Sequence, residues 1–179
     1  MTSKALILVD FEKEWTDKSS DYFVGDISEL IEKTNKLIDY CRKNDYKIIF
    51  TTHIEKDSDE AFVENSENVE IFDEINKQDS DVLIKKNKIS PFYQTDLYKH
   101  LEGIDEIVIA GILTNLCVRS LAQDAYDRDF EIKIIKDCCR AFDEETHNFT
   151  IKDLKATREE IEFLNLNEFI EYNGAKIIL

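Results

Sequence analysis

The sequence predicts an α/β protein built on a doubly wound parallel sheet. Short apolar runs alternate along the chain with segments whose apolar residues recur at spacings of three and four, as strands alternate with amphipathic helices. The runs are apolar throughout, so both faces of each strand should be buried, which antiparallel sheets seldom require. Strands joined by helices form right-handed βαβ units. A length of 179 residues suits one domain, which we assign to residues 1–179.

The first half of the chain holds three predicted strands and one long helix. Ala5–Val9 (ALILV) is a continuous apolar run that ends at Asp10. In residues 27–41 the apolar side chains fall on one face of a helix, and Cys41 lies on that face as a core residue. Two more strands follow, Lys47–Thr52 (KIIFTT) and the shorter Asp81–Lys85 (DVLIK).

The second half repeats this alternation. Glu106–Ala110 (EIVIA) is a buried run followed by Gly111, and Leu116–Asp127 places Leu121 and Ala125 on one side of a helix. The remaining predicted elements are a helical turn or two at Thr95–Leu101, a strand at Ile132–Ile135, a helix at Glu144–Lys155 and a strand at Glu160–Leu164.

Two segments leave their role open. The tail Tyr172–Leu179 ends in Lys-Ile-Ile-Leu and would suit an extra edge strand or an oligomer contact, and the sequence does not decide between them. Glu55–Glu70 is acidic and long for a connection between a strand and a helix. It would suit a lid over a site, but a solvated loop is the commoner explanation and the one we favour.

Composition excludes several classes of partner. Asp and Glu number 39 against 23 Lys and Arg, a formal net charge of −16 that repels nucleic acid and anionic lipid. No apolar run approaches the roughly 20 residues of a membrane span. The N-terminal residues do not resemble a signal peptide, and the four cysteines form no C-x-x-C pair. We therefore expect a cytoplasmic protein with no membrane or nucleic-acid partner.

Chemically capable side chains follow the predicted strands. In an open parallel sheet, ligands bind beyond the carboxyl ends of the strands. The residues that this rule selects are Asp10, Thr51, His53, Lys85, Lys86, the segment Gly111–Cys117, and Asp137 with Cys138 and Cys139. A carboxylate, a lysine and a thiol should thus meet at one edge of the sheet.

Cys117 is the candidate nucleophile among them. Thr114 or Asn115 would cap the helix that follows, so the thiol should sit in its first turn, where the macrodipole favours a thiolate. Free N–H groups there could bind an oxyanion. If Asp10 and Lys86 lie about 4 Å apart, their attraction is roughly 4 kcal/mol at an effective dielectric of 20, before desolvation. Such a pair could take the thiol proton.

Three segments resemble the signatures of the isochorismatase-like cysteine hydrolases, a superfamily that includes nicotinamidases and N-carbamoylsarcosine amidases. The segments are Ala5–Trp15 (ALILVDFEKEW), Lys86–Leu97 (KNKISPFYQTDL) and Gly111–Val118 (GILTNLCV). The resemblance continues through Ala122–Ala125 (AQDA), Ile134–Cys138 (IIKDC) and Glu144–His147 (EETH), in the family's order. It implies a three-layer, Rossmann-like fold with six parallel strands, and a homo-oligomer.

The resemblance also implies a catalytic triad of Asp10, Lys86 and Cys117. Lys86 is preferred to Lys85 because it lies four residues before Ser90, where the family places its lysine. A cis peptide bond between Ile112 and Leu113 is implied too, and it would direct the N–H of Leu113, with that of Cys117, toward a substrate oxyanion. Plausible walls of the substrate pocket are Phe11, Trp15, His53 and Phe92.

Other positions depart from the family pattern. Nicotinamidases of the superfamily bind a metal through an Asp-x-His and a further His, whereas this chain has Thr51-Thr52-His53, so we expect no metal and no other cofactor. Glu12 stands in place of the usual Gln, Trp15 in place of the usual Phe, and Pro91 in place of a small residue. These changes leave the substrate undetermined. His147 is interpreted as a packing or capping residue, and Cys138 and Cys139 as structural, although either could line the pocket.

We therefore expect an amidohydrolase that cleaves a C–N bond of a small amide through a thioester on Cys117. One alternative is hydrolysis of an isochorismate-type vinyl ether, in which the aspartate acts as an acid and the cysteine is dispensable. Another is a catalytically idle member of the family that serves as a binding or scaffold module.

Overall fold

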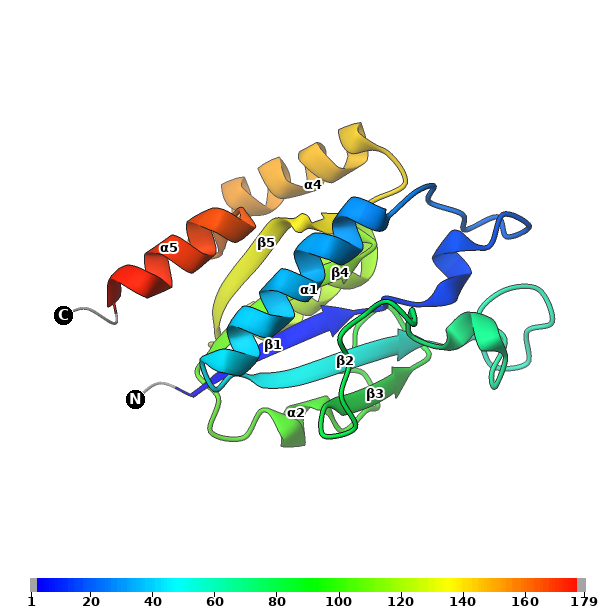
Figure 1. The fold of residues 1–179 in the computed structure, drawn as a ribbon, viewed down its shortest axis with the longest axis horizontal. Helices are drawn as coiled ribbons and strands as arrows, with labels where there is room; N and C mark the ends of the chain where they lie inside the picture. Colours follow the sequence, from blue (N-terminus) through cyan, green and yellow to red (C-terminus); the bar gives the residue numbers. More distant parts are fainter. Residues whose placement is uncertain (1–2, 177–179) are drawn as a thin grey trace.

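Six parallel strands form one sheet at the centre of the protein. The computed structural model describes residues 3–176. The strands are β1 (Lys4–Val9), β2 (Lys47–His53), β3 (Val82–Lys86), β4 (Glu106–Ile112), β5 (Glu131–Arg140) and β6 (Glu162–Leu164), arranged in the order β3-β2-β1-β4-β5-β6 (Figure 1). The chain builds outward from β1 to β3 and then from β4 to β6, so the direction of winding reverses between β1 and β4.

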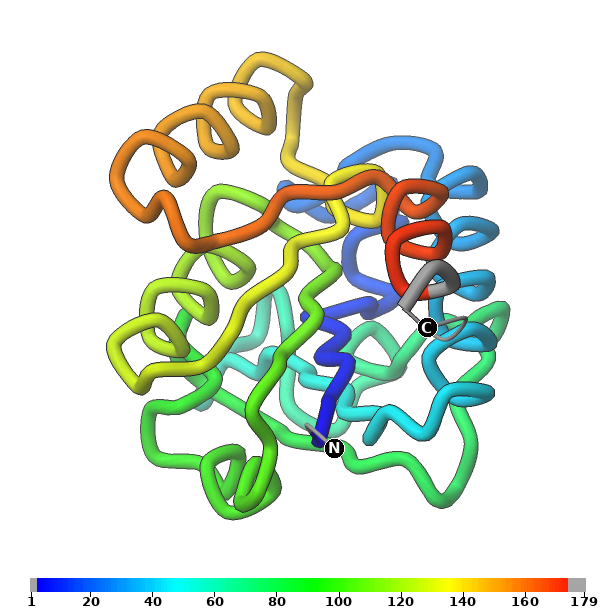
Figure 2. Tube along the Cα trace, turned by 90° about the vertical axis from the view of Figure 1, so that its left-hand side faces the viewer, coloured from blue at the N-terminus to red at the C-terminus, as the bar shows by residue number. Residues whose placement is uncertain are grey.

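Helices cover both faces of the sheet and complete the three predicted layers. On one side lie α1 (Ser28–Lys43) and α5 (Leu166–Lys176), and on the other α2 (Leu97–His100), α3 (Arg119–Tyr126) and α4 (Glu144–Thr157). Figure 2 shows the three layers from the side, with α1 and α5 to the right of the sheet and α3 and α4 to the left. Within residues 3–176, no helix is long and apolar enough to cross a membrane.

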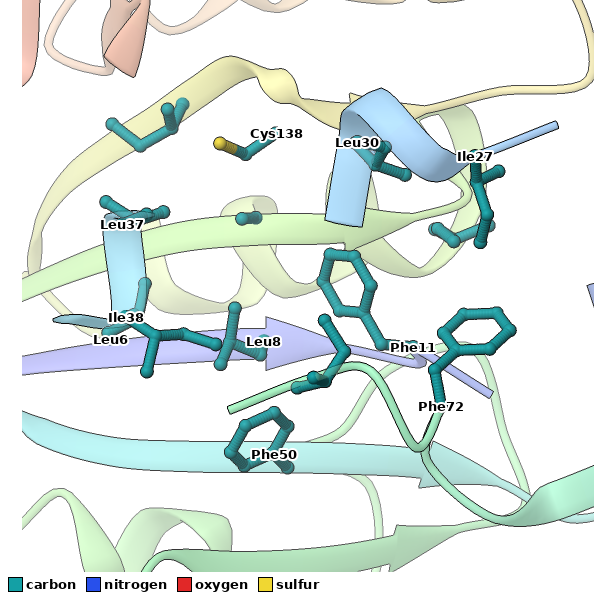
Figure 3. Packing of buried hydrophobic residues seen from close by; sticks show 14 of the residues in the cluster. Leu6, Leu8, Phe11, Ile27, Leu30, Leu37, Ile38, Phe50, Phe72 and Cys138 are labelled. Carbon is teal, nitrogen blue, oxygen red and sulfur yellow. The ribbon is translucent and has the colours of Figure 1, made fainter. Parts of the chain in front are cut away.

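The two faces of β1 bury separate apolar layers, as a strand covered on both sides requires. Leu6 and Leu8 pack with Ile38 of α1 and Phe50 of β2 (Figure 3). The alternate residues, including Ile7, point into the second layer among the side chains of α3 and α4. Cys41 is fully buried in the first layer, as its place on the apolar face of the helix predicts.

A close approach of backbones brings the carboxyl ends of β1 and β4 together. Val9 pairs with Gly111 in the ladder between these strands. A Cβ atom added at Gly111 would lie 2.9 Å from the Cα of Val9 and closer still to its carbonyl oxygen. Only glycine leaves room for this contact, which fixes where the chain leaves β4.

Strand β5 is longer than the apolar run predicts. Its ladder with β4 shifts register after Ile109, which pairs with Ile134, and resumes where Gly111 pairs with Cys139. This bulge accommodates extra residues of β5 and lets pairing continue to Arg140. Cys138 and Cys139 therefore lie within the strand, whereas the sequence predicted that they follow it.

The structure also shows where most of the tail and the long loop lie. Helix α5 continues through Tyr172 to Lys176, so this part of the tail is no edge strand, and Ile177–Leu179 lie outside the described residues. In the loop 55–70, Phe62 and Val69 are buried in the first apolar layer. The loop is therefore anchored to the protein over part of its length, and it is not simply solvated.

An ion pair interrupts the apolar interior at the other end of the sheet. Lys133 of β5 donates a hydrogen bond to Glu106 of β4, and both side chains are buried. Tyr46 also donates to Glu106, at 3.3 Å. This cluster lies where β4 begins, at the edge opposite to the carboxyl ends of the strands.

Candidate active site

Asp10, Lys86 and Cys117 meet beyond the carboxyl ends of the strands, where the winding reverses between β1 and β4. The Nζ atom of Lys86 lies 2.7 Å from Oδ2 of Asp10 and 3.3 Å from Sγ of Cys117. Asp10 follows β1, Lys86 ends β3, and Cys117 lies in a turn after β4, so the parallel topology brings them together. Residues at such a reversal are well placed to bind a ligand.

The main chain turns sharply at Asp10 to aim its carboxylate at Lys86. Asp10 has φ 54°, in the left-handed region that non-glycine residues seldom adopt. The hydroxyl of Thr51 donates to its Oδ1 at 2.6 Å, and the indole of Trp15 donates to its carbonyl oxygen at 2.7 Å. Asp10 is fully buried, so the Thr51 hydroxyl and Lys86 replace the water that its carboxylate needs.

Lys86 stands at the centre of the site. Its side chain is fully buried and its Nζ atom also lies 3.3 Å from Nδ1 of His53. Burial is the largest single effect and would lower the pKa of Lys86, but the charges of Asp10 and Cys117 and the hydrogen bonds to them together outweigh it and raise the pKa. Lys86 is therefore an ammonium with three acceptor atoms within 3.3 Å of Nζ, one in an ion pair and two in hydrogen bonds.

Cys117 lies in a π-helical turn, Thr114–Val118, that leads into α3. The N–H groups of Leu116 and Val118 both donate to the carbonyl oxygen of Leu113, each at 3.2 Å. The peptide bond between Ile112 and Leu113 is cis, as the family resemblance implies. Neither Thr114 nor Asn115 caps a helix as predicted, and the Thr114 hydroxyl lies 2.8 Å from Nδ1 of His147 instead.

The thiol of Cys117 is protonated at rest, contrary to the thiolate that the helix position predicts. Burial raises the pKa of Cys117 and the neighbouring charge of Asp10 raises it further, while Lys86 lowers it without reversing the direction. Because the thiol is buried beside a carboxylate, these effects exceed that of the macrodipole, which is worth about 1 kcal/mol. Any thiolate must therefore form by proton transfer within the site.

A second carboxyl lies close to the triad without a cation of its own. Glu12 is fully buried, and one of its oxygens accepts the backbone N–H of His53. The other, Oε2, has no hydrogen-bond partner in the part of the chain that the structure describes. Burial and then the charge of Asp10 raise the pKa of Glu12 well above its usual value. The folded protein therefore favours the protonated form of Glu12 more than the unfolded chain does.

Aromatic side chains cover one side of this site. The ring of Trp15 lies 5.1 Å from Phe62, 6.2 Å from Tyr22 and 6.5 Å from Phe142, measured between centroids. Phe62 also meets the imidazole of His53 edge to face at 5.2 Å. Buried Glu14 holds Phe62 in place by accepting its backbone N–H at 3.2 Å. The cluster has an apolar surface that an uncharged organic group could contact.

Two of the predicted pocket residues lie elsewhere. Phe11 points into the first apolar layer beside Phe72, whereas the preceding Asp10, in its left-handed conformation, directs its carboxylate to Lys86 (Figure 3). Phe92 stacks on Phe130 with the guanidinium of Arg128 4.4 Å above its ring, near the start of β5. Trp15 and His53 do lie beside the triad.

The structure also locates the three other candidate side chains, those of Cys138, Cys139 and His147. Cys138 is buried in the first apolar layer and Cys139 in the second, and burial raises the pKa of both thiols. His147 is half-buried, and burial lowers the pKa of its imidazole. Its hydrogen bond to Thr114 joins α4 to the turn that carries Cys117, which gives it a more specific role than packing.

The donor set does not fit a divalent metal. In residues 3–176 no group of three or more His, Cys, Asp or Glu side chains is arranged to hold one. Nδ1 of His53 faces Lys86, and Nε2 lies 2.7 Å from Oε1 of Glu55. The Thr51 hydroxyl donates to Asp10 and does not face His53. A cation beside His53 would be repelled by the Lys86 ammonium.

Four further residues lie near the site although the sequence did not indicate them: Phe62, Tyr22, Phe142 and Glu55. Phe62 is the one aromatic residue in the acidic stretch 55–70, and an isolated aromatic side chain in a polar loop is a usable signal for an anchored segment. Glu55 lies two residues beyond His53, the spacing that places side chains on the same side of an extended chain. No local pattern distinguishes Tyr22 or Phe142.

Comparisons with known proteins find relatives of this chain and solved structures that share its fold. A model of the isochorismatase domain matches residues 4–162. The chain is 26% identical to nicotinamidase 3 of Arabidopsis thaliana over 165 residues, which are 84% of this chain and 79% of the relative. The structure of an isochorismatase family protein from Desulfovibrio vulgaris superposes with a TM-score of 0.88 at 17% identity, covering 97% of this chain and 100% of the other. A pyrazinamidase from Pyrococcus horikoshii, solved in complex with zinc, gives a TM-score of 0.81 at 22% identity, over 91% and 99%.

Proposed function

The chain belongs to the isochorismatase family, and from that premise we propose that it is a cysteine hydrolase that cleaves the C–N bond of a small amide. The observation that carries the proposal is the position of the Lys86 ammonium, 2.7 Å from the Asp10 carboxylate and 3.3 Å from the Cys117 sulfur. A nucleophile, a base and a cation that holds both in place are the parts that covalent catalysis needs.

Acylation begins with the protonated thiol. Cys117 gives its proton to Asp10 as its sulfur bonds to the carbonyl carbon of the amide, and a tetrahedral oxyanion forms. Asp10 then gives that proton to the nitrogen and the C–N bond breaks. Ammonia or an amine leaves, and the acyl group remains on Cys117 as a thioester. Asp10 thus serves first as base and then as acid.

Hydrolysis of the thioester reverses these roles. A water molecule gives a proton to Asp10 as its oxygen attacks the thioester carbon, and the C–S bond breaks to release the carboxylic acid. The proton then returns from Asp10 to the sulfur. Lys86 stays positively charged throughout, and it stabilises the Asp10 carboxylate and the transient thiolate in turn.

The backbone N–H groups of Leu113 and Cys117 are the proposed donors to the oxyanion. Both belong to the turn between β4 and α3, whose path is fixed by the Gly111 contact and the two bonds to the Leu113 carbonyl. Donors already held in place cost no reorganisation when charge develops, and one such donor is worth roughly 2.7–4 kcal/mol.

The proposal needs only the small-molecule amide and water. No cofactor takes part, and treatment with a chelator should leave the rate unchanged. We also propose that the protein is a cytoplasmic homo-oligomer, which light scattering and fractionation would test. A neutral substrate group suits the apolar cluster of Trp15, Phe62, Tyr22 and Phe142.

A trapping experiment tests the covalent intermediate. Hydroxylamine competes with water for a thioester, so a turned-over amide should yield hydroxamate together with the acid. Cys117→Ala should yield neither, whereas Cys41→Ala removes a buried thiol far from the triad and should yield both. Hydroxamate formation by Cys117→Ala would refute the proposal. Cleavage of a vinyl ether by Cys117→Ala would instead favour the isochorismate-hydrolysing type of activity.

A further inference from the structure

The ammonium of Lys86 has three hydrogens and three acceptors. Two of these, Asp10 and Cys117, take part directly in the proposed chemistry. The third is Nδ1 of His53, 3.3 Å from Nζ. The Lys86 side chain is fully buried, so in the resting site the acceptors of its ammonium come from the protein.

The tautomer of His53 follows from its two neighbours. An ammonium can only donate, so the ring nitrogen facing it, Nδ1, must be the unprotonated acceptor. The proton then sits on Nε2, which donates to Oε1 of Glu55 at 2.7 Å. Glu55 is about half exposed, at 53% of its side chain, so it connects this buried chain of hydrogen bonds to the surface.

We propose that His53, oriented by Glu55, is a positioning residue that holds the Lys86 ammonium between Asp10 and Cys117. The proposal rests on the function proposed above. It differs from a role as a wall of the substrate pocket, because a wall contacts substrate and any residue of similar size can serve. Here one atom matters, the acceptor at Nδ1.

The other groups near Lys86 do not hold the ammonium in this position. Oε1 of Glu12 accepts the backbone N–H of His53, and the Thr51 hydroxyl donates to Asp10. Oε2 of Glu12 has no hydrogen-bond partner among residues 3–176, so without His53 the ammonium would tilt away from the line between Asp10 and Cys117 toward that oxygen. A hydrogen bond to a charged group is worth roughly a factor of ten to a hundred, which sets the scale of the loss.

Two conservative variants separate the two ring nitrogens. In His53→Asn the side-chain oxygen stands near the place of Nδ1 and can still accept from Lys86. In His53→Gln the amide reaches the place of Nε2, so contact with Glu55 can persist while the acceptor for Lys86 is lost. His100→Gln makes the same change in α2, where the His100 carbonyl meets Lys47 at the start of β2.

The readout is the reactivity of Cys117 toward iodoacetamide across pH, resolved from the other cysteines by peptide mass spectrometry. Lys86 lowers the pKa of Cys117, so a displaced ammonium should slow alkylation at any pH below full ionisation. We expect alkylation in His53→Gln to be about tenfold slower or more, approaching that of Lys86→Met. His53→Asn should stay within about threefold of the wild type, and His100→Gln should match it.

The outcomes distinguish a failure of the role proposed for His53 from a failure of the proposed function. Equal rates for His53→Asn and His53→Gln, with Lys86→Met slow, would overturn the role of His53 and leave the triad standing. An unchanged rate in Lys86→Met would overturn both, because Lys86 would then not act on Cys117. Thermal unfolding of each variant verifies that it is folded. Once a substrate is found, His53→Gln should lower kcat with little change in KM, whereas a pocket wall would mainly raise KM.

Discussion

Removing the charge of Lys86 should destabilise the protein more than removing both charges of its pair. In Lys86→Met the buried carboxylate of Asp10 loses its cation while the apolar stem is kept. Two unit charges 2.7 Å apart attract by about 6 kcal/mol at an effective dielectric of 20, and desolvation offsets part of this. Breaking such a buried pair from one side costs about 3–5 kcal/mol.

The double variant Asp10→Asn with Lys86→Met is the control. It leaves neither charge buried, so it should unfold with a free energy within about 1–2 kcal/mol of the wild type. Urea unfolding can be followed through Trp15, the one tryptophan of the chain, whose indole donates to the Asp10 carbonyl. The single variant should also melt roughly 6–20 °C below the wild type. A single variant as stable as the double would refute the idea that Asp10 and Lys86 are a buried ion pair.

Three further predictions use neighbouring groups. Because burial raises the pKa of Glu12, its carboxyl binds a proton in the folded state that the unfolded state releases, so stability falls as pH rises above the ordinary glutamate range. The difference in the free energy of unfolding between Glu12→Gln and the wild type should therefore favour the variant more at pH 8 than at pH 5. An equal difference at both pH values in urea titrations would contradict this. Asp10→Asn should lose turnover yet alkylate faster at Cys117 at pH 8, because the Asp10 charge raises the thiol pKa; slower alkylation would count against that cause. Gly111→Ala should lose about 3 kcal/mol or more in urea unfolding, since its Cβ meets the backbone of Val9, and a loss under about 1 kcal/mol would show that the strands can move apart.

The sheet and the meeting of Asp10, Lys86 and Cys117 are predictable because both follow from chain-wide regularities. Runs such as Ala5–Val9 are apolar at every position, which identifies a strand covered on two faces. Once the strands are parallel, the residues that follow them share one edge. Identifying Lys86 over Lys85 needed the family resemblance, because the composition of the strand does not separate them.

Features that depend on neighbours distant in sequence could not be predicted. The bulge in β5 depends on how it pairs with β4, and the raised pKa of Cys117 depends on burial that the sequence does not display. The burial of the Lys133–Glu106 pair likewise needs both strands in place. Phe11 was predicted to line the pocket, but the turn of the main chain at Asp10 directs the Asp10 carboxylate to the site and the Phe11 ring into the first apolar layer.

The central claim is that the Cys117 sulfur attacks an amide carbon. Its most direct test is ammonia release from a panel of small primary amides by the wild type, Cys117→Ala and Cys41→Ala, each shown to be folded by thermal unfolding. We predict release by the wild type and by Cys41→Ala, and none above background by Cys117→Ala. Release by Cys117→Ala at the wild-type rate would contradict the account.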